Sequence, residues 1–358
     1  MAVLTEGFGN PSALYSLGRQ AAADLKTRRG QVAAALGCLP EELFFTSCGS
    51  ESDNWAIQAA VHLGRHKGKH IITTAIEHAA VLEPCRALER QGYEVTYLLP
   101  DKTGSIAIEQ LEQALRPDTV LVSMMLVNNE LGTLLPVAQA AQAIRRAGSP
   151  ALLHTDAVQA FLKIPFTPKQ LGVDLLSVSG HKIHAPKGVG ALYVRRGLKL
   201  PPMILGGGQE NGLRSGTEAT AQIAAFAAAV RAGGASLQQD LAHMAQLKQY
   251  TLEQLAAHIP EVRPVALGEV PHILAITLPG YKSEVVVRML GDLGVCVSAG
   301  SACHRGKASH VYAALKLNKA QQDGVLRISF SYDTTRQDAD ALVQALSQAR
   351  QQLFPTLS

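Results

Sequence analysis

The stretch Ser177–Lys182 contains the residue with the most distinctive chemical potential in the sequence. A predicted strand ends there in small and polar residues, and Lys182 follows, flanked by His181 and His184. A lysine on a loop at a strand end can be desolvated and lose its proton, and its amine can then form a Schiff base. A solvated surface lysine is the alternative, and it describes most lysines.

A second candidate, Asp156, directly follows the apolar run Leu152–Thr155. A carboxylate at such a strand end could pair with the protonated ring nitrogen of pyridoxal phosphate (PLP), whose ring then acts as an electron sink. In isolation, Asp156 is equally well explained as the N-cap of a following helix.

The run Phe44–Glu51 reads as a strand, a turn of small residues and the start of a helix. Backbone N–H groups at a helix N-terminus bind phosphate well. The turn matches neither the GxxxxGK pattern of a nucleotide P-loop nor the GxGxxG pattern of a dinucleotide site. A phosphate site of another kind remains open beside the commoner explanation, an ordinary turn.

A glycine-bounded segment, Ser298–Gly306, carries Cys303 followed by His304 and Arg305. Positive charge near a thiol lowers its pKa and increases the thiolate fraction. Cys296, in an apolar context, is expected to be buried and unreactive. An inert thiol is the alternative for Cys303 as well.

The elements that must position these residues alternate between short apolar runs and longer amphipathic ones. This pattern predicts an α/β fold with a mostly parallel sheet covered by helices on both faces, in which chemistry collects at the carboxyl ends of the strands. The predicted strands are Leu43–Phe45, His70–Thr73, Val95–Leu98, Val120–Met125, Leu152–Thr155, Leu175–Ser179 and Gly190–Val194.

The pattern changes after about Arg231. Two domains suit a chain of 358 residues, and we expect a large domain over 1–235 and a small α+β domain over 236–358. Arg231–Ala235 is the predicted junction. The small domain should contain a long helix over Leu237–His258 and strands over His272–Leu278 and Val325–Phe330.

Composition narrows the function classes. The chain has 33 Lys and Arg against 29 Asp and Glu, a formal net charge of +4, with 47% hydrophobic and 17% charged residues. These values exclude bulk disorder. The mild charge does not favour nucleic acid or a membrane surface as a partner. No apolar run approaches the roughly 18 residues of a membrane helix, and the N-terminus does not read as a signal peptide.

The five cysteines form no CxxC pair. We therefore expect free thiols in a reducing compartment, no metal site, and a cytoplasmic location.

Nine motifs follow one another along the chain. They are FGNPS (Phe8–Ser12), FTSCGSESDN (Phe45–Asn54), IEH (Ile76–His78), NNE-G (Asn128–Gly132), HTDAVQ (His154–Gln159), SGHK (Ser179–Lys182), GGGQENGLRSGT (Gly206–Thr217), GSAC (Gly300–Cys303) and R-S (Arg327, Ser329). In this order, from about Phe8 to Thr335, the chain resembles the cysteine desulfurases of the NifS/IscS type. These belong to the class-V PLP enzymes with the aspartate-aminotransferase fold (PLP fold type I), which implies a seven-stranded sheet.

The resemblance implies a role for each matching residue. Lys182 would bind PLP covalently as a Schiff base, and His78 would stack on the ring and move protons. Asp156 would pair with the ring nitrogen, and Gln159 would hydrogen-bond the ring oxygen. The phosphate would be held by Gly49, Ser50, Ser179, His181 and, from the partner subunit of a homodimer, Thr217.

The resemblance also implies the substrate, L-cysteine. Asn129 would orient cofactor and substrate, and Arg327 would bind the substrate carboxylate. Cys303 would take the sulfur as a persulfide, L-alanine would leave, and a sulfur-acceptor protein would follow, such as an iron–sulfur scaffold or a tRNA-thiolation protein.

The chain departs from the family pattern in several places. An opening segment of the YLDNAATT kind is not seen before FGNPS, and Tyr15, Ala219, Ala275 and Ser331 replace usual family residues. Three alternatives therefore stay open: a class-V aminotransferase, a selenocysteine lyase, and an inactive homologue that acts as a dimeric scaffold or binding protein.

Overall fold

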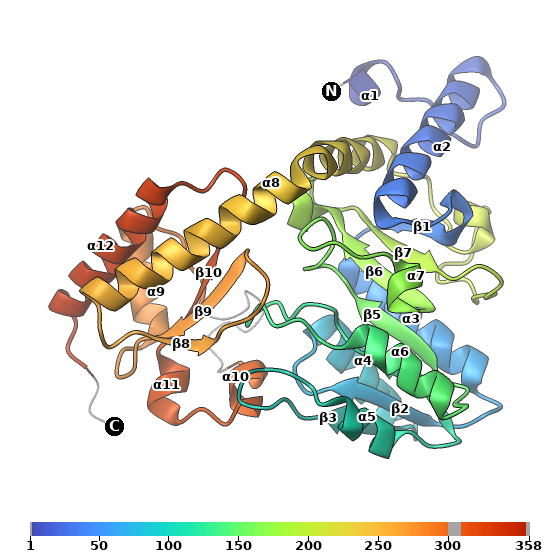
Figure 1. The fold of residues 1–358 in the computed structure, drawn as a ribbon. Coiled ribbons are helices and arrows are strands. Elements are labelled where there is room, and N and C mark those ends of the chain that lie inside the picture. The colour runs from blue at the N-terminus through green and yellow to red at the C-terminus, as the bar shows by residue number, and fades with distance from the viewer. Residues whose placement is uncertain (1, 300–308, 356–358) are drawn as a thin grey trace. The chain divides into compact units, whose positions relative to one another are not determined.

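The computed structural model describes residues 2–299 and 309–355 (Figure 1). The chain groups into two compact units. The first comprises Met1–Leu98, Ile108–Leu126 and Pro136–Ser236, and the second comprises Leu99–Ala107, Val127–Leu135 and Leu237–Ser358. The two short excursions into the second unit, before α5 and after β4, were not predicted from the sequence.

The first unit is built on a seven-stranded sheet with the strand order β1-β7-β6-β5-β4-β2-β3. Only β7 runs against its neighbours, so the predicted mostly parallel α/β sheet is confirmed. Most of its strands are buried along their whole length, as apolar strands covered on both faces must be. The strands are β1 (Leu43–Thr46), β2 (His70–Thr74), β3 (Glu94–Leu98), β4 (Thr119–Ser123), β5 (Leu152–Asp156), β6 (Leu175–Ser179) and β7 (Gly190–Val194).

Helices cover both faces of this sheet. Figure 1 shows α3 and α6 on opposite sides of it, and α3 packs across β4 to β7. The helix α2 ends at Gly37, whose φ of 77° is the left-handed C-cap conformation that favours glycine. The helices are α1 (Ala2–Thr5), α2 (Ser16–Leu36), α3 (Gly49–Gly64), α4 (Ala79–Glu89), α5 (Ile108–Ala114), α6 (Val137–Arg146) and α7 (Pro168–Leu171), with 3-10 turns η1 (Pro40–Glu42), η2 (Gly180–Ile183) and η3 (Glu210–Gly212).

The second unit has a three-stranded antiparallel sheet with the order β10-β9-β8. Its own apolar core contains Leu274, Ile276, Leu326 and Leu346, all buried. This matches the α+β character that the sequence predicts. The elements are β8 (Arg263–Ala266), β9 (Ile273–Thr277), α9 (Ser283–Asp292), α10 (His310–Ala314), α11 (Lys319–Asp323), β10 (Val325–Ser329) and α12 (Arg336–Gln352).

The predicted junction at Arg231–Ala235 lies next to the boundary of the two units, which falls at Ser236. A single helix of 39 residues, α8 (Thr220–His258), runs through this boundary. Neither glycine of the segment has a positive φ, and both stay within the helix.

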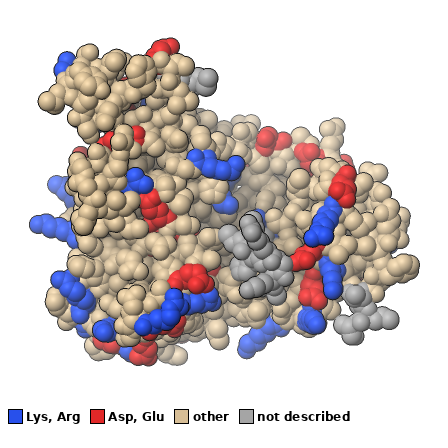
Figure 2. Space-filling model, turned by 180° about the vertical axis from the view of Figure 1, so that it is seen from behind, with Lys and Arg blue, Asp and Glu red and all other residues tan. Residues whose placement is uncertain are grey.

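Two surface properties bear on function. Within residues 2–299 and 309–355, no helix has the length and apolar character needed to cross a bilayer. On the face shown in Figure 2, basic and acidic side chains are interspersed and do not gather into one patch of a single sign.

Candidate active site

Four of the predicted site segments follow strands that run in the same direction in the first unit. The turn before Gly49 follows β1, His78 follows β2, Asp156 ends β5, and Lys182 follows β6. Parallel strands bring their carboxyl ends to one edge of a sheet, which is where α/β proteins place their ligands. Motifs that are far apart in the sequence therefore lie together at this edge of the sheet.

Asp156 is the buried centre of the cluster, with 6% of its surface exposed. Burial raises the pKa of its carboxyl group, whereas the Val158 N–H and the positive charges of His78 and Lys182 act in the opposite direction. The side chains of His78 and Lys182 are thus close enough to Asp156 to affect its ionisation. The Val158 N–H donates to Asp156 Oδ1 at 2.9 Å and closes a local turn at the end of β5.

Lys182 is half-buried on the 3-10 turn η2, directly after β6. One residue earlier, His181 Nδ1 lies 2.8 Å from the hydroxyl oxygen of the buried Ser179. Partial desolvation, followed by the charges of Lys182 and Lys187, lowers the pKa of His181. A neutral His181 and a Ser179 hydroxyl are suited to hydrogen-bond an anionic group.

His78 is the N-cap residue of α4, and its ring is oriented by the backbone. Its Nδ1 accepts a hydrogen bond from Ala80 N at 3.1 Å. Because a backbone N–H can only donate, the neutral ring carries its proton on Nε2. The half-buried imidazole therefore has a fixed tautomer, as a ring that stacks and transfers protons requires.

The N-terminus of α3 forms the phosphate side of the candidate site. Gly49 packs so closely that an added Cβ would lie 2.8 Å from Val158 Cγ2 and 3.5 Å from Ser179 Cβ. This glycine therefore lets the start of the helix approach the segments that follow β5 and β6. Ser50, the next residue, is exposed in the first turn, where N–H groups lack partners within the helix.

Gln159 and Thr217 lie in the first unit outside regular strands and helices. Gln159 is half-buried in the turn after β5, and Thr217 is exposed shortly before α8. Their predicted contacts with the ring oxygen and with the phosphate of a partner subunit stay predictions.

These residues fit PLP. Asp156 can hold a proton on a ring nitrogen, Lys182 supplies an amine for the aldehyde, and the α3 N-terminus with Ser179 supplies donors for a phosphate. The Gly49 contact adds a backbone cradle that a side chain would fill.

The two predicted substrate-binding residues both lie in the second unit and contact each other. Arg327 Nη1 donates to the carbonyl oxygen of Asn129 at 2.9 Å. The Arg327 backbone exchanges hydrogen bonds with Ser298, at 2.7 and 3.1 Å, so the segment that leads towards Cys303 is anchored beside Arg327. Burial raises the pKa of Tyr312, Glu130 adds to this effect and Arg327 opposes it, so these three side chains lie together as well.

Cys303 lies outside the described residues. Cys296, predicted to be buried, is exposed, so that prediction is wrong. Its apolar neighbours Val295 and Val297 pack against the core of the second unit, whereas the thiol of Cys296 between them remains accessible.

The sequence reading missed several charged residues that hold the site segments in place. Glu51 accepts hydrogen bonds from the Ser47 amide and hydroxyl and forms an ion pair with Arg214 at 2.7 Å. Although burial alone would raise the pKa of Glu51, these hydrogen bonds hold it below its usual range. Both residues lie inside two of the nine motifs, and their opposite charges could have predicted an ion pair between these motifs.

A second missed ion pair joins Arg29 of α2 to Glu210, at 2.7 Å. Glu210 is 7% exposed and also accepts from Phe45 N. The pair fastens the GGGQENGLRSGT segment to α2 and β1. No local pattern connects residues that are so far apart in the sequence.

The departures from the family pattern fall in different environments. Tyr15 and Ala219 are exposed, and Ser331 is partly exposed just after β10. Ala275 is fully buried on β9, directly opposite Arg327 in the β9–β10 register. Its small side chain is therefore the departure nearest to a predicted substrate-binding residue.

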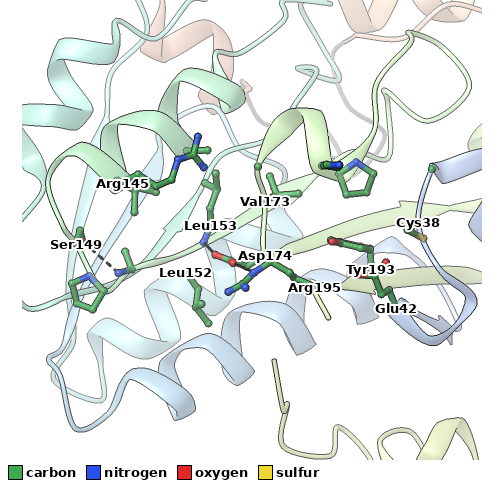
Figure 3. Close-up of a pocket in the computed structure, with 18 of the residues that line it drawn as sticks. Cys38, Glu42, Arg145, Ser149, Leu152, Leu153, Val173, Asp174, Tyr193 and Arg195 are labelled. Carbon is green, nitrogen blue, oxygen red and sulfur yellow. Dashed lines mark hydrogen bonds and ion pairs between the residues drawn. The ribbon is translucent and has the colours of Figure 1, made fainter. Parts of the chain in front are cut away.

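A cavity of about 1050 Å³ lies elsewhere in the first unit (Figure 3). It is lined by Leu152 and Leu153 at the start of β5, by Val173 and Asp174 before β6, and by Glu42 before β1, among others. These are the amino ends of the strands. The cavity is therefore at the opposite edge of the sheet from Asp156 and Lys182.

Comparison with known proteins agrees with the geometry. The family described as aminotransferase class-V matches residues 1–342. A cysteine desulfurase of Nostoc sp. is 39% identical over 357 residues, which cover 99% of this chain and 88% of that protein. The cysteine desulfurase IscS of Methanosarcina thermophila is 38% identical over 356 residues, which cover 98% of this chain and 87% of that protein.

Solved structures point the same way. A NifS-like protein superposes with a TM-score of 0.93 at 34% identity, covering 98% of this chain and 94% of that one. The structure of SspA in complex with cysteine gives a TM-score of 0.78 at 35% identity, with 93% and 94% covered. The chain therefore belongs to the PLP-dependent class-V aminotransferase family and, within it, to the cysteine desulfurases of the NifS/IscS type.

Proposed function

We propose that this chain takes sulfur from L-cysteine, releases L-alanine and holds the sulfur on Cys303 as a persulfide. One observation carries the proposal: the buried Asp156 carboxylate lies within electrostatic reach of both His78 and Lys182. That triad of acid, imidazole and amine at a strand edge is what a PLP enzyme needs at the cofactor ring.

On the cofactor side, each residue acts on a different part of the ring system. Lys182 Nζ would bind the cofactor covalently, and Asp156 would hold the proton on the ring nitrogen. Gln159 would donate to the ring oxygen, and His78 would stack on the ring. Bound PLP would supply an electron sink for negative charge at the substrate Cα. The phosphate would be held by Gly49, Ser50, Ser179, His181 and the partner subunit's Thr217.

On the substrate side, Arg327 binds the carboxylate of L-cysteine through its planar fork, and Asn129 orients the amino acid. The amine of Lys182 would take the proton from the substrate Cα and return a proton there at the end of the reaction, and His78 Nε2 would assist in the transfer. Arg327 is already held by the Asn129 carbonyl in the described structure, so it is oriented before substrate arrives.

Sulfur transfer then needs the thiolate of Cys303. It attacks the substrate Sγ, an S–S bond forms, and the Cβ–Sγ bond breaks with its electron pair left on Cβ, where a proton completes the methyl group of alanine. The sum is L-cysteine plus the Cys303 thiol giving L-alanine plus the Cys303 persulfide. An acceptor protein, such as an iron–sulfur scaffold or a tRNA-thiolation protein, takes the sulfur in the next exchange.

We infer a homodimer, because Thr217 is assigned to the partner's phosphate site. Exposed apolar side chains near the N-terminus support it, since monomers rarely expose several together: Leu4, Phe8, Leu14, Tyr15 and Leu17 are each more than 40% exposed. Light scattering coupled to size exclusion should give twice the mass of one chain, and the mass of a single chain would contradict the inference.

A cytoplasmic location belongs to the same proposal. All four described cysteines, Cys38, Cys48, Cys85 and Cys296, are free thiols. A reducing compartment keeps such thiols free, and it also keeps a persulfide donor able to exchange.

The decisive test is anaerobic incubation with L-cysteine, followed by quantification of alanine and mass spectrometry of the Cys303 peptide. We expect alanine and one added sulfur atom on Cys303. Cys303→Ala should lose both, whereas Cys296→Ala, which removes the exposed thiol seven residues earlier in the sequence, should keep both.

Other outcomes of that test would identify the alternatives. Turnover that survives Cys303→Ala would indicate an aminotransferase, and turnover confined to L-selenocysteine would indicate a selenocysteine lyase. Protein that stays colourless after addition of PLP would indicate a scaffold. Each of these outcomes would overturn the proposed function.

A further inference from the structure

A chain of buried hydrogen bonds lies in the first unit next to Asp156, and the reaction described above does not use it. Its centre is His154 on β5, which is 0% exposed. His154 Nδ1 lies 2.9 Å from the hydroxyl oxygen of Ser123, and Nε2 lies 3.0 Å from that of Ser177. Both ring nitrogens therefore have partners on the two neighbouring strands.

Asp53 of α3 joins this chain through a hydrogen bond with Ser177. It is 1% exposed, and its Oδ1 lies 3.6 Å from His154 Nε2. Among the described residues, this oxygen has no hydrogen-bond partner. A buried carboxyl oxygen without a hydrogen bond costs free energy, so the position of Asp53 beside His154 calls for an explanation.

The strand register places this chain beside Asp156. Residues two apart on a strand lie on the same face, so His154 and Asp156 share one face of β5. In the sheet, Ser123 pairs with His154, and Ser177 pairs with Asp156. The helix α3 packs against this part of the sheet and brings Asp53 to the same place.

The charges around Asp53 decide how the group is ionised. Burial raises the pKa of Asp53 well above its ordinary value, the charge of Asp156 adds to the effect, and smaller contributions come from Glu77 and Cys48, while a hydrogen bond from Ser177 opposes them.

The neighbours of Asp53 respond in the same sense. Burial lowers the pKa of His154 to about 3 and raises that of Glu77 to about 8. Asp156 differs from the other two carboxyl groups, because His78 and Lys182 face it and favour its charged form. Burial therefore favours the protonated form of both Asp53 and Glu77.

We propose that His154 and Asp53 are positioning residues for Asp156. The chain from Ser123 through His154 and Ser177 to Asp53 fixes the position of the Asp156 carboxyl group. The inference rests on the proposed role of Asp156 towards the cofactor ring.

The test compares the PLP affinity of cofactor-free protein with the pH midpoint of the visible absorbance of bound PLP. Asp53→Ala and His154→Asn should weaken PLP binding about tenfold or more, as expected when a buried hydrogen-bond partner is left unsatisfied, and should shift the midpoint. Asp53→Asn keeps a hydrogen-bonding group of nearly the same shape and should leave both close to those of the unmodified protein.

The matched control is Thr155→Val. Thr155 lies between His154 and Asp156 on β5 but on the opposite face, is 0% exposed, and its hydroxyl has no hydrogen-bond partner among the described residues. Removing that hydroxyl should change neither readout. A cooperative thermal unfolding transition shows that each cofactor-free variant folds. If His154→Asn does not fold, the comparison of Asp53→Ala with Asp53→Asn decides the test.

Three results would overturn the inference. They are unchanged affinity and midpoint in Asp53→Ala, a weaker affinity with an unchanged midpoint, and a shift in Asp53→Asn as large as in Asp53→Ala. Asp156→Ala separates this inference from the proposed function. If Asp156→Ala binds PLP normally, the assigned role of Asp156 fails, whereas an effect confined to Asp156→Ala overturns only the inference on Asp53 and His154.

Discussion

Arg327 is oriented by its surroundings before any substrate is present. Its Nη1 donates to the Asn129 carbonyl, and its backbone is bonded to Ser298. Glu130 and the buried Tyr312 lie close to its charge. A guanidinium held in this way loses little conformational freedom when it binds a carboxylate, which strengthens the interaction.

We predict that Arg327→Lys raises the KM for L-cysteine about tenfold or more, because an ammonium group cannot reproduce the two parallel hydrogen bonds of the guanidinium. The PLP content should stay that of the unmodified protein. Steady-state kinetics with absorbance of the bound cofactor measures both. Arg336→Lys is the control, since Arg336 is exposed and lies over the Tyr250 ring. An unchanged KM in Arg327→Lys would remove Arg327 from the substrate site.

At this scale, the sequence identifies residues whose neighbours along the chain carry the signal. Lys182 and Asp156 are recognisable because their motifs surround them. Asp53 and His154 lie inside two of the same motifs, but their meaning depends on a distance between α3 and β5 that no local pattern contains. Cys296 shows the reverse error, because an apolar context does not determine which side of the chain is covered.

Among the elements, Glu77 fastens the end of β2 to the segment after β4. It is fully buried, and its Oε1 accepts from Met125 N and from the Thr74 hydroxyl, both at 2.8 Å. Burial raises its pKa from 4.5 to about 8. His78 follows directly, so this carboxyl group supports the turn that carries the predicted ring-stacking residue.

The raised pKa of Glu77 predicts a pH dependence of stability. Between pH 4.5 and about 8, the unfolded chain has released this proton and the folded chain has not. The folded state then binds more protons, so its free energy of unfolding falls as pH rises, by about 1.4 kcal/mol per pH unit from this group. Glu77→Gln removes the effect and keeps an acceptor oxygen.

Urea unfolding of cofactor-free protein at several pH values checks this prediction. The stability of the unmodified chain relative to Glu77→Gln should decrease steadily from pH 5 to pH 8. Glu109→Gln, on the exposed side of α5, should show no such trend. A constant difference between the unmodified chain and Glu77→Gln would mean that Glu77 is already ionised in the fold.

The sequence also predicts most strands of the large sheet, because each is a short apolar run buried on both faces. It fails where a contact between distant segments decides the outcome. The excursions Leu99–Ala107 and Val127–Leu135 pack with the second unit although they lie among elements of the first. The same cause hides the Arg29–Glu210 pair from a reading of the sequence.

For the whole molecule, the notable feature is that two units with separate apolar cores share one helix. The first core includes Trp55 and Ile71, and the second includes Leu274 and Leu346. Their boundary, at Ser236, falls inside α8, next to Gly233 and Gly234. Glycine in a helix interior costs conformational entropy, so this is where α8 is intrinsically weakest.

We predict that replacing both glycines by alanine stabilises the chain by about 1 to 2 kcal/mol, the sum of two helix-propensity gains of about 0.5 to 1 kcal/mol each. Space permits both changes. A Cβ at Gly233 would meet only Leu162 Cδ1, at 3.7 Å, and one at Gly234 would meet nothing within 4 Å. The urea midpoint of cofactor-free protein measures the gain.

Gly18→Ala in α2 is the opposing control, because its Cβ would lie 2.8 Å from both Ala13 Cβ and the Asn10 carbonyl oxygen, and that variant should lose stability. If the double alanine variant were also less stable, α8 could not be continuous in solution. If it were more stable but turned over L-cysteine more slowly, the reaction would require a helix that is easily deformed at the two glycines. Stability measurements alone would not reveal that requirement.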